Sequence, residues 1–237
     1  MHRLKVVVSG TGRSGTVYMA RALTNLGYTC GHESIFTPSG FDRAIELLNN
    51  PNLIVTSRVD VNSENCVFDS GLQVAESSYM SSPYLDKPIL NNTKIIHVTR
   101  NPLLVLSSTF IDANFFDDGN PIQTIYRNFV YSHLGELKKI KNLLERSAAY
   151  YVWWNNMVEF NCNHKNYLRV QVENIEKEEF FNFLNVPITS FDKIDKKINS
   201  WKIRDKNVMI SDIPDGTIKK EFVDIIERYG YEKNTFI

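Results

Sequence analysis

The apolar residues of the chain fall in short runs that alternate with helical patterns. Leu4–Val8 is a short apolar run rich in β-branched residues, and Lys94–Thr99 (KIIHVT) and Tyr167–Val172 (YLRVQV) have the same character. Runs of this kind predict strands that are buried on both faces, as in a parallel sheet. Two further strands are expected at Tyr28–Gly31 and near Leu53–Thr56.

Helical patterns follow several of these runs. In Val17–Gly27 the apolar residues lie on one helical face, and Gly27 suits the C-cap. After KIIHVT, Asn101 can cap a helix that has Pro102 at its first position. Helices are also expected over Asp42–Leu48, Pro121–Asn161 and Glu178–Leu184. Strands that alternate with helices predict a three-layer α/β sandwich with a mainly parallel central sheet.

Composition narrows the classes of protein that fit. The 237 residues suit a single domain over 1–237, and 43% hydrophobic residues can bury a sizeable core. Lys and Arg number 27, as do Asp and Glu, so the formal net charge is zero, which argues against a nucleic-acid partner. The three cysteines form no CxxC pair, and no apolar run approaches the roughly 20 residues of a membrane span. We expect a soluble, cytoplasmic protein.

The glycine-rich segment Gly10–Thr16 (GTGRSGT) is the first candidate site. It follows the first strand, and doubly wound sheets bind ligands at the carboxyl ends of their strands. Gly10, Gly12 and Gly15 let the backbone curl with its N–H groups inward, and the next helix adds the positive end of its dipole. Arg13 contributes a charge, while Ser14 and Thr16 contribute hydroxyls. The segment therefore predicts a site for a phosphate or a sulfate.

Two other nucleotide-binding motifs compete for the same segment. A P-loop kinase using ATP and magnesium needs a Lys where this chain has Thr16. The dinucleotide fingerprint GxGxxG matches at Gly10, Gly12 and Gly15, yet no strand ending cleanly in an acidic residue follows about 20 residues later. Glu33 keeps that alternative open.

The second candidate site is TRNPLLVLSS. Arg100 ends the KIIHVT strand, and Ser108 follows eight residues later on the helix that Asn101 starts. The planar fork of an Arg fits a phosphate through two hydrogen bonds, and a Ser hydroxyl can add a third. Taken alone, the motif fits a helix cap with a surface ion pair equally well.

Together the two motifs resemble the sulfotransferase family that uses 3′-phosphoadenosine 5′-phosphosulfate (PAPS), in its carbohydrate-type and bacterial branches. The stretches GHESIFT (Gly31–Thr37), ESSYMSSPYL (Glu76–Leu85) and YLRVQVENI (Tyr167–Ile175) are similar to bacterial members. The resemblance implies a P-loop NTPase-like topology. It also implies a cofactor, PAPS, whose product is adenosine 3′,5′-bisphosphate (PAP), and no metal.

The resemblance assigns roles residue by residue. Gly12, Arg13, Ser14, Gly15 and Thr16 would hold the 5′-phosphosulfate, Arg100 and Ser108 would bind the 3′-phosphate, and Arg13 would also assist catalysis. The catalytic base would be Glu33, with His32 as the alternative. The acceptor would be a hydroxyl or an amine on a carbohydrate or small molecule. A catalytically silent nucleotide-binding protein remains a further alternative to both the sulfotransferase and the kinase.

Three other features have more ordinary interpretations. His97 lies inside an apolar strand, which favours a hydrogen-bonded core residue. Trp153 and Trp154 lie in an aromatic helix, where packing into the core is the default and a wall for the acceptor is the alternative. Ser77 and Ser78 fit either the wall of a cleft or a plain surface loop.

Overall fold

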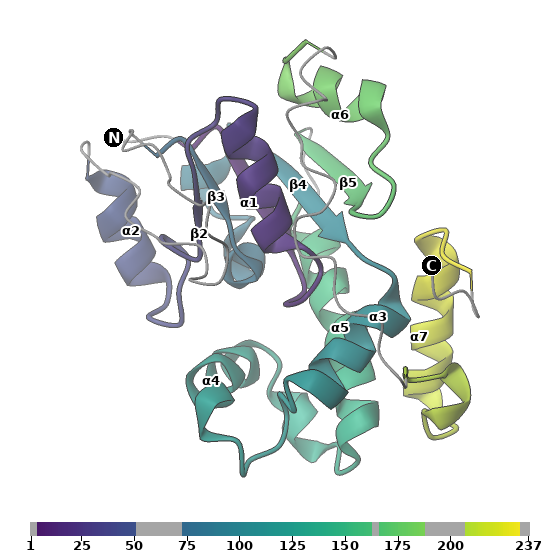
Figure 1. The fold of residues 1–237 in the computed structure, drawn as a ribbon. Coiled ribbons are helices and arrows are strands. Elements are labelled where there is room, and N and C mark those ends of the chain that lie inside the picture. Colours follow the sequence, from purple (N-terminus) through teal and green to yellow (C-terminus); the bar gives the residue numbers. More distant parts are fainter. Residues whose placement is uncertain (1–3, 51–72, 163–165, 188–206, 233–237) are drawn as a thin grey trace.

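The computed structural model describes residues 4–50, 73–162, 166–187 and 207–232. Five strands of this part of the chain form one sheet in the order β2-β3-β1-β4-β5, and all neighbouring strands are parallel (Figure 1). The strands are β1 (Val6–Gly10), β2 (Cys30–His32), β3 (Ala75–Ser77), β4 (Lys94–Thr99) and β5 (Tyr167–Gln171). Because all five run in one direction, their carboxyl ends meet at a single edge of the sheet.

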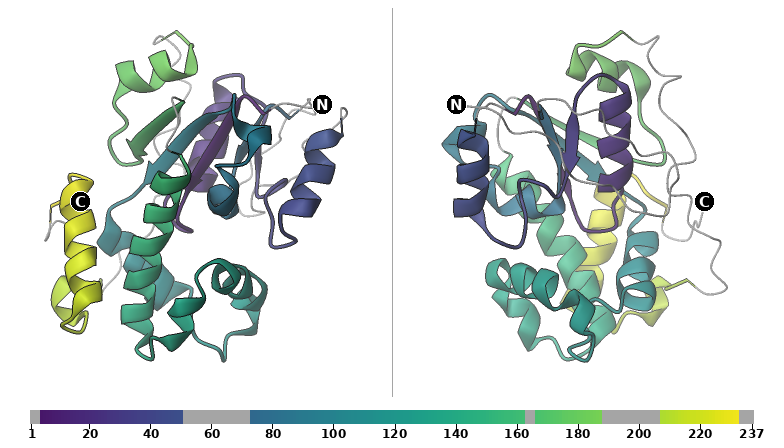
Figure 2. Two further views of the ribbon diagram at one scale, coloured as in Figure 1. Left: turned by 180° about the vertical axis from the view of Figure 1, so that it is seen from behind. Right: turned by 60° about the vertical axis from the view of Figure 1, so that its left-hand side comes forward.

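Helices flank the sheet on both faces, as Figures 1 and 2 show. The helices are α1 (Thr16–Asn25), α2 (Phe41–Asn49), α3 (Pro102–Ser107), α4 (Thr124–His133), α5 (Leu143–Asn161), α6 (Lys177–Leu184) and α7 (Thr217–Arg228). Three shorter turns also bear on the site: the 3₁₀ helices η1 (Tyr79–Tyr84) and η4 (Pro121–Gln123), and the π-helical turn η3 (Ser108–Asp112). None of the described helices is both long enough and apolar enough to span a bilayer.

The central strand β1 is buried on both faces, as its run of valines predicts. Val6 and Val8 belong to the apolar cluster that includes Leu23 of α1 and Phe181 of α6. Val7 belongs to the cluster on the opposite face, which contains Trp154 of α5. Successive side chains of a strand point to opposite faces, so one short strand connects both halves of the core.

The α/β class and the parallel sheet expected from the sequence are confirmed. The KIIHVT strand has the expected bounds, and Asn101 caps α3 by accepting a hydrogen bond from the Leu103 N–H (3.0 Å), with Pro102 at the first helical position. The strand expected near Leu53–Thr56 lies outside the described residues. The sequence predicted no strand at Ala75–Ser77, where β3 lies.

Candidate functional site

The glycine loop joins β1 to α1 at the middle of the sheet. Gly15 caps α1 in the left-handed conformation, with φ 106°, and a Cβ there would lie 2.9 Å from Cγ2 of Val172. A Cβ on Gly10 would collide with the carbonyl oxygen of Val98. Arg13 also has a positive φ, of 72°, which is uncommon for a residue that has a side chain. The loop is therefore tightly curled, and two of its glycines are required by contacts.

Buried serines fix the loop from beneath. Ser77 Oγ, at the end of β3, donates to the Thr16 carbonyl (2.7 Å), and Ser9 Oγ lies 2.7 Å from Ser82 Oγ of η1. Within the loop, Ser14 Oγ donates to the Thr11 carbonyl (2.7 Å). Ser77 is completely buried, so the alternative of a plain surface loop for this serine is wrong. The Ser14 hydroxyl is likewise buried and takes part in the shape of the loop.

The two sequence motifs meet at Arg13. Its Nε donates to Ser108 Oγ at 3.1 Å, and Arg100 Nη1 lies 3.5 Å from the Arg13 carbonyl oxygen. Ser108 is fully buried at the junction of α3 and η3. The loop after β1 and the loop after β4 thus form one structure, although 95 residues separate Arg13 from Ser108.

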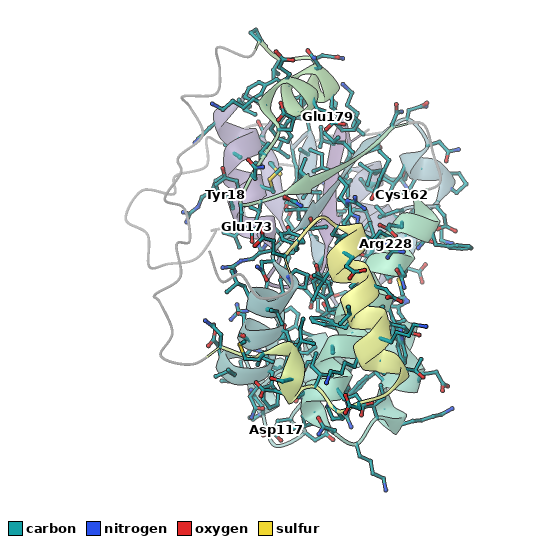
Figure 3. The ribbon with its side chains drawn as sticks, turned by 90° about the vertical axis from the view of Figure 1, so that its right-hand side faces the viewer. Tyr18, Asp117, Cys162, Glu173, Glu179 and Arg228 are labelled. Atoms are coloured by element: carbon teal, nitrogen blue, oxygen red, sulfur yellow. The ribbon has the colours of Figure 1, made fainter. Side chains whose placement is uncertain are left out.

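Residues after β5 complete the side of the site that contains Arg100. Glu173 Oε1 accepts a hydrogen bond from the Asn101 N–H (2.8 Å) and lies 3.9 Å from Arg100 Nε. Lys177, at the start of α6, lines the same cavity as Glu173 and Tyr18 of α1. Figure 3 shows Tyr18 and Glu173 on the same side of the molecule. Sequence interpretation missed Glu173, although its place just past a buried strand was a usable signal.

His32 ends β2 and Glu33 follows it, on the other side of the glycine loop. Thr16 Oγ1 lies 3.2 Å from His32 Nε2, and that nitrogen lies 3.9 Å from Glu33 Oε1. Burial lowers the pKa of His32 to about 4, so the imidazole is neutral at pH 7. Burial, and to a smaller extent the charge of Glu76, raise the pKa of Glu33 to about 7 against the opposing effect of Arg13. Of the two groups, Glu33 changes its charge nearer neutral pH.

A second carboxylate, Glu76 on β3, lies buried beneath Glu33. It accepts hydrogen bonds from the N–H groups of Ser34 (2.7 Å) and Ile35 (2.9 Å), from Ser34 Oγ (2.7 Å) and from Gln73 Nε2 (2.6 Å). These bonds hold the turn in which Glu33 has a φ of 51°. Burial is the main cause that raises the pKa of Glu76. Sequence interpretation gave Glu76 no role.

Residues from each of these loops line one cavity of about 760 Å³. Among the predicted residues, the lining includes Gly12, Arg13, Gly15, Thr16, His32, Glu33 and Arg100, whereas Ser14 and Ser108 lie behind it. The Gly12 N–H donates to the hydroxyl of Tyr150 on α5 (3.0 Å), a residue that sequence interpretation overlooked inside an apolar helix. Within the described ranges, no group of three His, Cys, Asp or Glu side chains is placed to hold a metal ion.

Of the three residues interpreted as core from sequence, His97 and Trp154 lie in the core, whereas Trp153 is half-buried and its indole N–H donates to Glu221 Oε2 (3.1 Å). His97 is fully buried, with Nδ1 2.8 Å from the Tyr167 hydroxyl and Nε2 2.8 Å from Asn155 Oδ1. Trp154 is fully buried, and its indole N–H donates to the Tyr79 carbonyl (3.3 Å). Neither side chain lines the cavity.

Comparison with known proteins gives no match. No protein-family model matches the chain, and no curated protein matches it significantly.

The pKa of Glu33 predicts a pH-dependent gain in stability for Glu33→Gln. A carboxyl whose pKa rises from 4.5 to about 7 on folding binds its proton more tightly in the folded state, so its contribution to stability falls as pH rises from about 4.5 to 7. A glutamine at this position does not titrate, so the variant does not lose stability in this way as pH rises. Relative to wild type, we expect it to gain stability over that range, by up to about 3 kcal/mol, and no more above pH 8.

Urea unfolding of both proteins at pH 4.5, 6 and 8 measures this gain. The lowered pKa values of His32 and His97 act in the opposite direction, but they act in both proteins and cancel in the difference. A difference in unfolding free energy that does not change with pH would contradict the assigned pKa of Glu33.

Proposed function

We propose that this protein is a PAPS-dependent sulfotransferase that transfers a sulfuryl group to a hydroxyl or an amine on a carbohydrate or small-molecule acceptor. The observation that carries the proposal is the contact of Arg13 with Ser108 beside Arg100, on a cavity whose opposite side carries Glu33. The P-loop-like topology is part of the proposal, and its support is the glycine loop between β1 and α1 at the centre of a parallel sheet.

The groups around the cavity suit an anionic nucleotide. The described lining residues include three cations, Arg13, Arg100 and Lys177, against two carboxylates, Glu33 and Glu173. The first residues of α1 also line the cavity, and the N–H groups of a first helical turn have no acceptor within their own helix. In addition, the hydroxyl oxygen of Thr109 on the cavity wall is buried without a hydrogen-bond partner among the described residues. This set of donors fits two separate phosphate groups.

Each residue then has a distinct role. The glycine loop and the start of α1 would hold the phosphosulfate end, with Arg13 and Thr16 adding charge and a hydroxyl. Arg100 would bind the 3′-phosphate directly, and the buried Ser108, which accepts a hydrogen bond from Arg13, would position Arg13. When bound, PAPS would supply a sulfuryl group attached to a phosphate leaving group.

Glu33 would accept the proton that an attacking hydroxyl loses. A base works best when its pKa lies near the working pH, and the pKa of Glu33, at about 7, meets this condition better than that of His32, at about 4. Arg13 and the amides of the loop would stabilise the negative charge that develops on the leaving oxygen. His32, which contacts Thr16, would help to position the loop.

Calorimetric titration with PAP, with ATP plus magnesium alongside, tests the choice of nucleotide. We expect PAP to bind and Arg100→Ala to weaken that binding by about 10- to 100-fold, because a charge-assisted hydrogen bond contributes about 1.5–3 kcal/mol. Arg43→Ala is the matched control, since Arg43 pairs with Glu46 on the surface of α2.

The alternatives give different results in the same titration. Binding of ATP with magnesium, without a response to PAP, would favour the kinase. Binding of PAP by a protein that sulfates no acceptor, with or without Glu33, would indicate a silent nucleotide-binding protein.

A further inference from the structure

The cavity has two chemically different ends. The sheet order puts β2 and β5 at opposite edges, so the residues that follow these two strands lie on opposite sides of the glycine loop. After β4 and β5 come Arg100, Glu173 and Lys177, which form the charged end. After β2 and β3 come Glu33 and Tyr79. The second end is called the aromatic end below.

Aromatic rings wall the aromatic end. Phe115 and Tyr150 stack with their ring centroids 6.0 Å apart and their planes 20° apart. The rings of Tyr79 and Tyr150 both pack against Trp154, at 6.0 and 5.5 Å, so the core fixes their positions. Tyr126 of α4 completes the wall and is more accessible, with 37% of its surface exposed. The wall thus offers flat apolar surface that is held in place before any ligand binds.

Glu33 lies close to this wall. Its charge contributes to the raised pKa values of three tyrosines that line the cavity, Tyr79, Tyr126 and Tyr150, although burial is the largest cause for each. The described cations of the lining are Arg13 in the glycine loop and the two residues of the charged end. An anionic acceptor at the aromatic end would meet the carboxylate of Glu33, with Arg13 as the one described cation near it.

The apolar surface continues outside the cavity. Ile122 and Ile125 flank Gln123 and Tyr126, two residues of the lining, and their side chains are 79% and 67% exposed. The 3₁₀ helix η4, which contains Ile122, leads directly into α4, which contains Ile125 and Tyr126, so both isoleucines lie within about one helical turn of Tyr126. A ligand held against Tyr126 can therefore extend an apolar group over the rim.

We propose that the aromatic end binds an uncharged acceptor that carries a flat apolar face, either an aromatic ring or the C–H face of a hexose, next to the hydroxyl that reacts. Tyr126 would determine this preference by stacking against the flat apolar face of the acceptor. This inference rests on the proposed function, because it assigns the charged end to the nucleotide. The described residues of the aromatic end do not supply the several cations that a polyanionic acceptor needs.

Three related glycosides test this inference. Saturation-transfer NMR on protein saturated with PAP would compare phenyl β-glucoside, methyl β-glucoside and phenyl β-glucuronide, which carries a carboxylate in place of the C6 hydroxymethyl group. We expect phenyl β-glucoside to bind and the glucuronide to bind at least about tenfold more weakly, because its charge faces Glu33. Methyl β-glucoside shows which flat face of the acceptor is recognised. If it binds about as well as phenyl β-glucoside, the site recognises the hexose; if it does not bind, the site recognises the aromatic ring.

Two variants locate the binding. Tyr126→Ala should weaken phenyl β-glucoside by about tenfold, since it removes an aromatic stacking partner. Phe160→Ala, which removes a ring that is 82% exposed and does not line the cavity, should change nothing. Equal or tighter binding of the glucuronide, an unaffected Tyr126→Ala variant, or no binding of either uncharged probe would overturn the inference.

Failure of the proposed function is distinguishable from failure of this inference. Each titration is repeated without PAP, and PAP binding is measured separately. If PAP does not bind while the uncharged probe still binds at Tyr126, the nucleotide assignment fails and the preference of the aromatic end stands.

Discussion

Replacing Glu33 by glutamine should lower turnover by about 10²- to 10⁴-fold, the usual contribution of a positioned general base. The side chain keeps its size, and the turn at residues 33–35 is held by Glu76, not by Glu33 itself. PAP affinity should therefore stay within about twofold of wild type. Initial-rate kinetics and calorimetry on the same preparations measure the two effects.

The pH profile identifies the group responsible. The turnover of the wild-type protein should rise with pH through about 7, because the ionised carboxylate is the active form of a base whose pKa has been raised to that value. The glutamine variant should lose this rise. His32→Gln is the comparison, since His32 is the alternative base. A larger loss of turnover in His32→Gln than in Glu33→Gln would make His32 the base and leave Glu33 with a positioning role.

The sequence predicted the local parts of this site well. Three features of the site are each encoded by consecutive residues and have a local physical cause. They are the glycine loop, the helix start at Asn101–Pro102 and the KIIHVT strand. Arg13 and Ser108 were expected to bind the same nucleotide, although their direct contact could not be read from the sequence. What brings them together is the pairing of β1 with β4.

The parts that sequence interpretation missed depend on distant partners. Strand β3 is three residues long, and its sequence, Ala-Glu-Ser, has no apolar run to mark it. Glu76 is buried only because the turn at Ser34 and Ile35, more than 40 residues away, supplies donors for it. Tyr150 sits in an apolar helix, where nothing local distinguishes a residue that reaches the glycine loop from one that fills the core.

Replacing Glu76 by alanine should cost about 3–5 kcal/mol of unfolding free energy. The truncation leaves the N–H groups of Ser34 and Ile35 without their acceptor, and each unsatisfied buried donor costs about 1–3 kcal/mol. The Gln73 amide loses one of its three acceptors and keeps Ser34 Oγ and the Ala75 carbonyl. Urea unfolding monitored by tryptophan fluorescence measures the loss. Glu136→Ala, at an exposed site that pairs with Lys139, should cost less than about 1 kcal/mol and is the control.

Glu76→Gln separates the structural role of this carboxylate from its electrostatic role. The shape is kept and the charge is lost, so the protein should fold with a smaller loss of stability, while the charge that helps to raise the pKa of Glu33 disappears. The rise of turnover with pH should then move to lower pH, a shift that a purely structural role would not produce. An unchanged midpoint would mean that burial alone sets the pKa of Glu33, and that Glu76 acts only by holding the turn.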